Sequence, residues 1–390
     1  MKVYKGIGLV LMVALVSGVS VANTDKQGIT ITANSTKHGA LPIAFETNRI
    51  DAFEHLSKIE SLEVYKGECL EVQKMLKQRV ACISDEIDGV SISVPLSTTQ
   101  NRVSLVKGRY LSSVKIADAA YNAIFKTEGS PFTTKLAIIA KNRKTNEYQL
   151  RVADYDGSGA RILHQTNEPI LSPSWSSSGR YLAYVSFETV RTSIFIHDTI
   201  TGKRIKALSF KGLNAYPDFI SDSKILVSLS NQSERSLVFE YDLLTKKLKK
   251  LTDSEKADIF PQHISDSKLA FVRLTENEIP YTYIKNGNSQ PKPLLSRPLN
   301  AVSISEKNTI VGLSRGDLLH YNIHQDKAIN ETRIDSSKGI ESPSISENGE
   351  LIVYVKEVEG KFSAYGSLKN GDNLFMLKSE THDLIQVSAF

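Results

Sequence analysis

The chain has 390 residues, enough for two domains of ordinary size. Its 48 lysines and arginines against 43 acidic residues give a formal net charge of +5 at pH 7, spread evenly along the sequence. A balance so close to neutral argues against a nucleic-acid partner, and we expect none. After the first 22 residues no apolar run is long enough to cross a bilayer, so we expect no membrane insertion.

The first 22 residues have the pattern of a cleavable secretory signal. Lys2 and Lys5 precede an apolar run that ends in the small-x-small sequence Ser20-Val21-Ala22. We therefore expect cleavage after Ala22 and an exported mature protein that begins at Asn23. A retained membrane anchor is the alternative, but the apolar run is short for a spanning helix.

Residues 23–128 are expected to form a small N-terminal α/β or α+β domain, because they mix the periodicities of strands and helices. Alternating apolar residues predict strands at 28–33, 41–45 and 80–84, and a hairpin from 91–96 and 103–106. Helical spacing predicts helices over 52–59, 70–76 and 114–125. Cys69 and Cys82, the two cysteines of the chain, lie 13 residues apart in this part of the sequence. They could form a disulfide in an oxidising compartment or remain two buried thiols.

Residues 129–390 contain a repeat that predicts a β-propeller. The copies PSWSSSGRYLAYV, PDFISDSKILVSL, PQHISDSKLAFVR, AVSISEKNTIVGL and PSISENGELIVYV begin at residues 173, 217, 261, 301 and 343. A sixth copy is split between Ile385–Phe390 and the segment near Lys135. The spacings of 44, 44, 40, 42 and 42 residues match a four-stranded blade. We therefore expect six blades.

The split copy predicts how the ring closes. Its first strand lies at Ile385–Ser388, and its other three lie at 135–140, 147–153 and 160–165. Pairing the last strand of the chain with these early strands would remove the free edges of an open ring. We expect the fold class to be a small N-terminal α/β domain followed by an all-β six-bladed propeller closed by the C-terminal strand.

The sequence contains no pattern that is typical of an active site. There is no G-x-S-x-G elbow and no H-E-x-x-H motif, and the histidines fall at scattered positions in the repeat. The acidic residues of the repeat occur in turns, where Asx turns account for them. We therefore expect no catalytic residue, no metal ligand and no cofactor.

Two segments resemble the TolB family of the bacterial Tol–Pal system. The first is YQLRVADYDGSGARILHQTNEPILSPSWSSSGRYLAYVSFE at Tyr148–Glu188, which is similar to the family pattern V-A-D-Y-D-G followed by P-x-W-S-P-D-G and K-L-A-Y-V-x-F-E. The second is KIADAAYNAIFKTEGSPFTTKLAIIA at Lys115–Ala140. The chain departs from the family in its turns, where S-P-D-G is replaced by SSSG, SDSK, SEKN and SENG.

The resemblance implies a non-catalytic periplasmic scaffold, and we expect a monomer. Its propeller face would bind a Pal-like peptidoglycan-associated lipoprotein, and its N-terminal segment would bind a TolA-like inner-membrane protein. The complex would support outer-membrane integrity and the inward movement of that membrane during cell division. The residues expected in the N-terminal contact are Asn23, Thr24, Asp25, Lys26 and Gln27.

The loops that join strand four to the next strand one, and strand two to strand three, should lie on one rim of the propeller. Their mixed charges around a central channel suit a folded protein partner. The residues expected in this contact are Glu168, Asn214, Tyr216, Lys256, Asp258, Arg297, Lys338 and Glu341. The alternatives are a secreted propeller enzyme, such as a peptidase, lyase or glycosidase, and a sensor for a small ligand.

Overall fold

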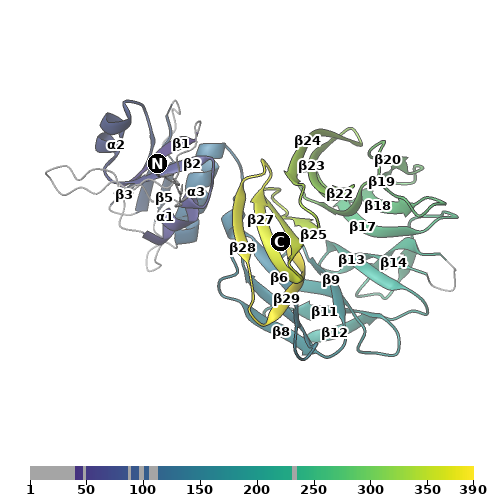
Figure 1. Ribbon diagram of the computed structural model, residues 1–390. Helices are drawn as coiled ribbons and strands as arrows, with labels where there is room; N and C mark the ends of the chain where they lie inside the picture. The colour runs from purple at the N-terminus through teal and green to yellow at the C-terminus, as the bar shows by residue number, and fades with distance from the viewer. Residues whose placement is uncertain (1–39, 47–49, 87–88, 96–100, 105–112, 231–234) are drawn as a thin grey trace, which may run out of the picture.

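The computed structural model describes residues 40–46, 50–86, 89–95, 101–104, 113–230 and 235–390. These residues form a small N-terminal α/β unit and a six-bladed β-propeller, as the sequence predicts (Figure 1). The expected signal sequence and the expected strand at 28–33 lie outside the described residues. None of the described helices is long and apolar enough to cross a membrane.

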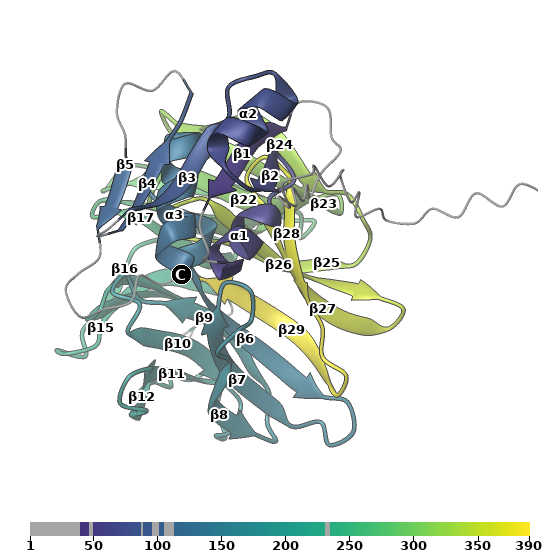
Figure 2. The same ribbon diagram turned by 90° about the vertical axis from the view of Figure 1, so that its left-hand side faces the viewer.

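The N-terminal unit is a five-stranded sheet with helices on both faces (Figure 2). Side chains alternate along its interior strand β1, so Ile43 and Phe45 pack with helices α1 and α3, whereas Ala44 packs beside Val72 of α2. The sheet order is β2-β1-β3-β4-β5, with β1 parallel to both neighbours. Its elements are β1 (Leu41–Glu46), α1 (Ile50–Ser57), β2 (Leu62–Lys66), α2 (Cys69–Leu76), β3 (Ala81–Glu86), β4 (Gly89–Ser93), β5 (Asn101–Ser104) and α3 (Ser113–Phe125).

Strand β2 was not expected from the sequence. Its five residues, LEVYK, follow α1 after a short turn and pair with β1 in parallel from Leu41↔Leu62 to Phe45↔Lys66. A segment this short carries only two alternations, and Leu62 and Val64 extend the apolar spacing of the preceding helix. The periodicity therefore did not separate strand from helix here.

The propeller has six antiparallel four-stranded sheets, which we number as blades 1 to 6 and whose strands run from the channel outward. A short 3-10 helix, η1 (Pro131–Thr133), precedes them. Blade 1 comprises β9 (Ile170–Trp175), β10 (Tyr181–Ser186), β11 (Ser193–Asp198) and β12 (Arg204–Leu208). Blade 2 comprises β13 (Asn214–Ser221), β14 (Lys224–Leu229), β15 (Leu237–Asp242) and β16 (Leu248–Lys250). Blade 3 comprises β17 (Asp258–Ser265), β18 (Lys268–Leu274), β19 (Pro280–Asn286) and β20 (Lys292–Pro293). Blade 4 comprises β21 (Asn300–Ile304), β22 (Thr309–Ser314), β23 (Asp317–His324) and β24 (Lys327–Asp335). Blade 5 comprises β25 (Ile340–Ile345), β26 (Leu351–Val358), β27 (Lys361–Leu368) and β28 (Asn373–Leu377). Blade 6 comprises β29 (His382–Ala389), β6 (Lys135–Asn142), β7 (Tyr148–Asp154) and β8 (Arg161–Thr166).

Each blade buries both faces of its second strand against its neighbours. In β10, Leu182 and Tyr184 pack with residues of blade 6, whereas Ala183 and Val185 pack with residues of blade 2. This two-sided burial explains why the second strand of each repeat is almost continuously apolar. A single blade could not bury both faces, so the sheets are stable only as neighbours in a ring.

The C-terminal strand closes the ring as predicted. Strand β29 pairs antiparallel with β6, from His382↔Asn142 to Ala389↔Leu136. The last residue adds to this closure, because the Phe390 amide donates to the Lys135 carbonyl at 2.9 Å and its ring lies 5.8 Å from that of Trp175. Gly179 is required beneath this ring, since a Cβ atom there would lie 2.7 Å from the Phe390 ring.

The N-terminal unit packs on one side of the propeller through a shared apolar core. Residues of β1, α1 and α3 belong to the same buried cluster as residues of blades 5 and 6. Polar contacts surround this core. The Tyr121 hydroxyl donates to the Glu350 carboxylate at 2.9 Å, the Lys58 ammonium lies 3.2 Å from the Asp156 carboxylate, and the Ser61 amide donates to Asp372. Each of these propeller residues lies in a turn between strands one and two or between strands three and four.

A disulfide joins Cys69 and Cys82 in the structure, linking the start of α2 to β3. The Cα atoms are 5.8 Å apart, within the usual range for a disulfide. The bond would hold α2 against the face of the sheet opposite α1 and α3. Pairing of the two residues in the mature protein stays a prediction.

Truncation of the C-terminus should be far more damaging than an ordinary tail deletion. Removing residues 384–390 takes away most of the β29–β6 pairing and exposes the edge of β6, so we expect loss of a cooperative thermal transition. Removing Phe390 alone, as the matched control, should keep the fold and lower the melting temperature by a few degrees. Circular dichroism melts would test this, and a cooperative melt of the longer deletion near that of the intact protein would contradict it.

Candidate functional site

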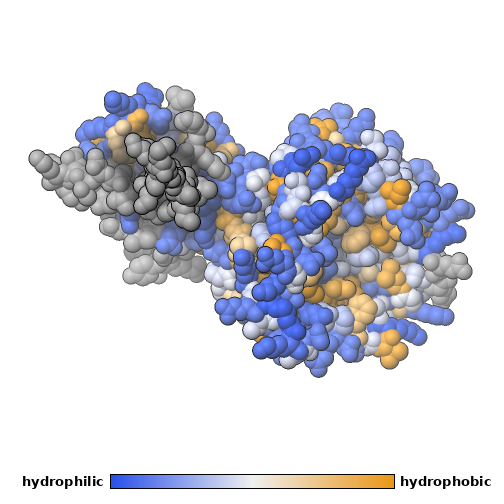
Figure 3. All heavy atoms as spheres, in the orientation of Figure 1, coloured by the Kyte–Doolittle hydropathy of each residue, from blue (hydrophilic) through white to orange (hydrophobic). Residues whose placement is uncertain are grey.

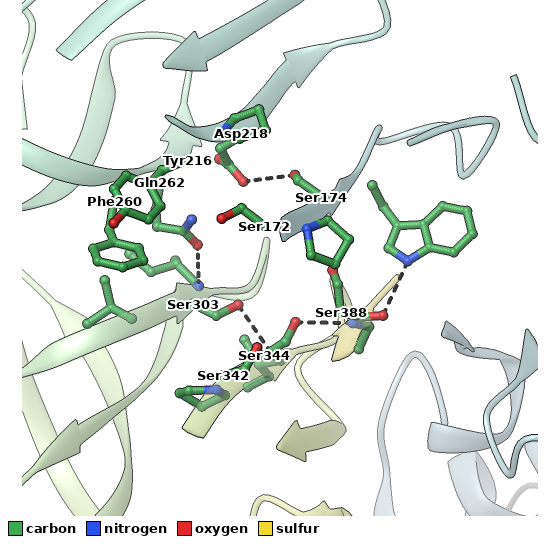
Figure 4. Close-up of a pocket in the computed structure, with 18 of the residues that line it drawn as sticks. Ser172, Ser174, Tyr216, Asp218, Phe260, Gln262, Ser303, Ser342, Ser344 and Ser388 are labelled. Atoms are coloured by element: carbon green, nitrogen blue, oxygen red, sulfur yellow. Dashed lines mark hydrogen bonds between the residues drawn. The ribbon is translucent and has the colours of Figure 1, made fainter. Parts of the chain in front are cut away.

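The first strands of the six blades surround a central channel with a volume of about 630 Å³ (Figure 4). All six blades contribute to its lining. The lining runs from residues near the start of the first strands, such as Tyr216 and Glu341, to Ser177, Glu306 and Glu347 in the turns between strands one and two. The channel mouth is the end at the rim formed by the loops that join strand four to strand one and strand two to strand three. The contacts of the N-terminal unit described above use turns of the opposite rim, so this rim is free of them.

A left-handed residue occurs at the same place in five of the six first strands. Its φ lies between 47° and 55°, a conformation that costs a non-glycine residue about 1 kcal/mol. In each case the register with the second strand shifts at this residue, which identifies a β-bulge. The bulges direct five side chains toward the channel mouth: Ser172, Tyr216, Phe260, Ala301 and Ser342.

Two of these bulge residues form an aromatic pair at the channel mouth. The ring centroids of Tyr216 and Phe260 are 3.8 Å apart, and both residues remain partly exposed. Aromatic groups that are held rigidly and half-exposed are typical of the residues that dominate protein interfaces. Tyr216 was predicted as a contact residue. Phe260 was not, although it precedes a proline as Tyr216 does and so had a detectable sequence signal.

Polar side chains two positions beyond the bulges connect neighbouring blades across the channel wall. Each accepts a hydrogen bond from a backbone amide of the next blade, and we call this set the polar belt (Figure 4). The Asp218 carboxylate accepts from the His263 backbone amide at 2.7 Å, and the Gln262 side-chain oxygen accepts from that of Ile304 at 3.2 Å. The Ser303 and Ser344 hydroxyl oxygens accept from the backbone amides of Ile345 and Ala389, at 3.2 and 3.1 Å. At the junction of blades 6 and 1, the Trp175 indole donates to the Ser388 carbonyl at 3.3 Å.

Carboxylates in the channel have strongly shifted pKa values. Burial raises the pKa of Asp218 to about 7, although hydrogen bonds from His263 and Ser174 oppose the shift. Burial, with the nearby charges of Glu306 and Asp218, raises the pKa of Glu347 to about 8. Asp218 and Glu347 are therefore largely protonated at mildly acidic pH and gain negative charge as the pH rises through 7 to 8. These shifts had no sequence signal, because Asp218, Glu306 and Glu347 come from three different blades.

The predicted rim residues fall into two groups, and the first is accessible. Glu168, Lys338 and Glu341 are exposed, and Tyr216 lies at the channel mouth. Lys256 is partly exposed, and its ammonium is 3.2 Å from the Glu276 carboxylate. Arg297 contacts Glu331 and the Tyr321 hydroxyl. These side chains could all reach a partner after small rotations, but their part in binding stays a prediction.

The second group, Asn214 and Asp258, requires a correction, because both side chains are fully buried. The side-chain oxygen of Asn214 accepts from the backbone amide of Phe210, and its side-chain nitrogen donates to the backbone carbonyls of Phe210 and Gly212. Asp258 forms a two-pronged ion pair with Arg273, at 2.7 and 2.9 Å. These residues fix the rim loops and do not present a polar group to a partner.

Exposed apolar side chains on the same rim were missed by the sequence reasoning. Four lie in loops between strands two and three or between strands four and one: Phe187, Val190, Leu213 and Ile279. The fifth, Val358, is the last residue of β26 and borders such a loop. Val190 is fully exposed. Across the propeller as a whole, Figure 3 shows a mainly hydrophilic periphery, with apolar residues gathered nearer its centre. A mixture of apolar and charged groups on one rim is typical of a protein-binding surface.

The segment Asn23–Gln27, predicted to bind a second partner, lies outside the described residues. Among the residues that the structure does describe, no group of three or more His, Cys, Asp or Glu side chains is arranged to hold a metal ion.

The shifted pKa of Glu347 predicts a pH-dependent effect on stability. Since its folded pKa of about 8 exceeds the ordinary value of 4.5, folding takes up a proton between these values, and the stability it contributes falls as pH rises through this window. Glu347→Gln should therefore raise the melting temperature by a few degrees at pH 8.5 and by almost nothing at pH 4.5. Glu255→Gln, an exposed control, should show no such trend. Equal effects of Glu347→Gln at both pH values would contradict the assignment.

The sequence and fold were compared with those of known proteins. The family model described as TolB beta propeller domain matches residues 121–383. The Tol-Pal system protein TolB of Alcanivorax borkumensis is 43% identical over 109 residues, which are 27% of this chain and 25% of that protein. The same-named protein of Hahella chejuensis is 45% identical over 102 residues, or 26% and 24% of the two chains. The aligned part of this chain thus spans about a quarter of the length of these relatives.

The solved structures extend the likeness to the whole fold. The crystal structure of TolB from Acinetobacter baumannii superposes with a TM-score of 0.75 over 92% of this chain and 98% of its own, at 21% identity. A chain of a nidogen/laminin complex superposes with a TM-score of 0.51 over 66% of this chain and 98% of its own, at 10% identity, and shows the propeller fold alone. Because the family model covers more than half of the residues, the chain belongs to the TolB β-propeller family.

Proposed function

We propose that the protein is a non-catalytic periplasmic scaffold of a Tol–Pal-like envelope complex. In this role the channel-mouth rim would bind a Pal-like lipoprotein, and the N-terminal segment would bind a TolA-like inner-membrane protein. The complex would support outer-membrane integrity and the movement of that membrane during division. Membership of the family, whose curated relatives carry the name Tol-Pal system protein TolB, supports the proposal.

The observation that carries the proposal is the combination of groups on the free rim. The Tyr216–Phe260 pair lies at the channel mouth, and exposed apolar side chains and charges of both signs lie on the same rim. Apolar anchors at the centre with a polar periphery are the usual arrangement of a protein interface. The rim opposite carries the N-terminal unit, so one partner could occupy each end of the molecule.

The alternatives raised from the sequence are not favoured by any feature of the channel. The raised pKa values of Asp218 and Glu347 could serve acid–base chemistry, but Asp218 is held by hydrogen bonds from two neighbouring blades. We therefore assign these carboxylates to the channel wall and do not propose an enzyme or a sensor for a small ligand.

Truncating the aromatic pair should weaken capture of a Pal-like lipoprotein. We expect Tyr216→Ala and Phe260→Ala each to raise the dissociation constant by about 10- to 100-fold, as anchors at an interface centre do. Because the rings stack, the double variant should lose less than the sum of the two effects. Isothermal titration calorimetry with the purified lipoprotein domain would measure this, with melting curves to confirm folding.

A charge reversal at the rim provides a matched pair of variants. Lys256→Glu should weaken the complex and lower its association rate, whereas Lys292→Glu, on the outermost strand of blade 3, should leave both unchanged. Equal effects of the two reversals would point to long-range charge and not to the rim. Unchanged binding by both Lys256→Glu and Tyr216→Ala would remove the proposed lipoprotein contact.

The N-terminal contact is tested separately. Deleting Asn23–Gln27 from the mature chain should lower binding to a TolA-like protein and leave the thermal transition unchanged, because a short terminal segment can add to a partner without supporting its own domain. Replacing the same five residues with Gly-Ser pairs controls for length. Full binding by the deletion variant would show that the second partner contacts another surface.

A further inference from the structure

A second surface, unrelated to the channel-mouth rim, lies on the outer strands of blades 1 and 2. It consists of β12, β16 and the turns that lead into them, and we call it the basic edge. Its exposed cations are Lys203, Lys206, Lys246, Lys247, Lys249 and Lys250. Although the net charge of the whole chain is small, the fold brings these residues together on two adjacent blades.

Acidic residues do not balance this edge. Residues 199–213 and 243–252 contain no aspartate or glutamate, whereas the outermost strand of blade 4, β24, includes Glu331, Arg333 and Asp335. Within the described part of the chain, Lys250 pairs with Asp253, and the structure records no carboxylate partner for the other five lysines. The edge therefore presents a one-signed field to its surroundings.

Protection of an exposed strand edge does not explain the cluster. Lysines on edge strands prevent sheets from pairing with one another, and every blade of a propeller has such an edge. The outermost strand of blade 5, β28, nevertheless contains no charged residue in Asn373–Leu377. A purely protective role would not concentrate lysines on two neighbouring blades and omit them from another.

Exposed aliphatic side chains project from both of these blades at equivalent turns. Ile200 is 77% exposed and Leu244 is 79% exposed, at positions that turns usually give to polar residues. Both turns are rigid. The Asp198 carboxylate accepts from the Ile200 and Thr201 amides, and the Asp242 carboxylate accepts from the Leu244 and Thr245 amides, at 2.7 to 3.0 Å.

We propose that the basic edge is a peripheral docking surface for a lipid bilayer that contains anionic headgroups. Lysine ammonium groups are attracted to such a surface without fixed geometry, and the two aliphatic tips would enter its apolar boundary. An acidic protein would use the lysines but would give no reason for two largely exposed aliphatic tips beside them. In both views β12 lies at the end of the propeller away from helices α1 and α3 (Figures 1 and 2).

Vesicle co-sedimentation of the full mature chain tests the proposal. The protein should bind vesicles of phosphatidylcholine with 30% phosphatidylglycerol at low salt and not vesicles of phosphatidylcholine alone. One lysine near an anionic surface is worth about fivefold in affinity, so Lys246→Gln, Lys247→Gln and Lys249→Gln together should weaken binding roughly a hundredfold. Lys327→Gln, Lys361→Gln and Lys378→Gln, exposed lysines of blades 4 and 5, are the control with the same change in charge.

The aliphatic tips give an independent measurement that separates a bilayer from a soluble polyanion. Ile200→Ser with Leu244→Ser should weaken vesicle binding about tenfold or more and leave binding to soluble poly-glutamate unchanged. Ile329→Ser with Met376→Ser, exposed apolar residues of blades 4 and 5, should change neither. All variants alter exposed side chains, and melting curves would confirm that they fold. Absence of vesicle binding by the parent, equal losses in the two lysine triples, or full vesicle binding by the tip variant would each overturn the proposal.

Discussion

Pairing between the two ends of the propeller sequence is the constraint on which the rest of the structure depends. Strand β29 comes from the C-terminus and β6 from the middle of the chain, and their hydrogen bonds complete blade 6. Only with six complete blades is each apolar second strand covered on both faces, as Leu182 and Ala183 show in blade 1. The channel, its bulges and its rim exist because this pairing fixes the number of blades and their curvature.

The polar belt applies the same constraint from the inside. Each accepting side chain bonds to an amide of the next blade, so a blade cannot move outward without leaving a buried amide unpaired, which costs about 1–3 kcal/mol. Asp218, Gln262, Ser303 and Ser344 occupy equivalent positions in four blades. Asp218 and Gln262 accept through different groups, and the two serines accept through a shorter side chain. The belt therefore tolerates changes of residue type as long as an acceptor is kept.

The propeller could be predicted from the repeat, whereas the local geometry of the site could not. Prolines at 173, 217, 261 and 343 recur with the period of a blade, which was enough to predict six blades and their closure. The left-handed residues before those prolines were missed, because residues before a proline ordinarily favour extended backbone. The rim was assigned from loop positions alone, which could not distinguish the accessible Tyr216 from Asp258, whose partner Arg273 lies on the adjacent strand.

The connection between the two parts of the molecule defines a path for mechanical load. The ring of Phe132 contacts those of Tyr121 and Tyr155, at 5.9 and 5.3 Å, and the chain runs from α3 through η1 directly into β6. Tension carried along the chain from the N-terminal unit therefore enters the propeller at β6. That strand is held by β29 on one side and β7 on the other, so the pull is shared across two ladders of hydrogen bonds. In a protein that transmits force between two partners, the load would enter the propeller at a strand that is hydrogen-bonded on both sides.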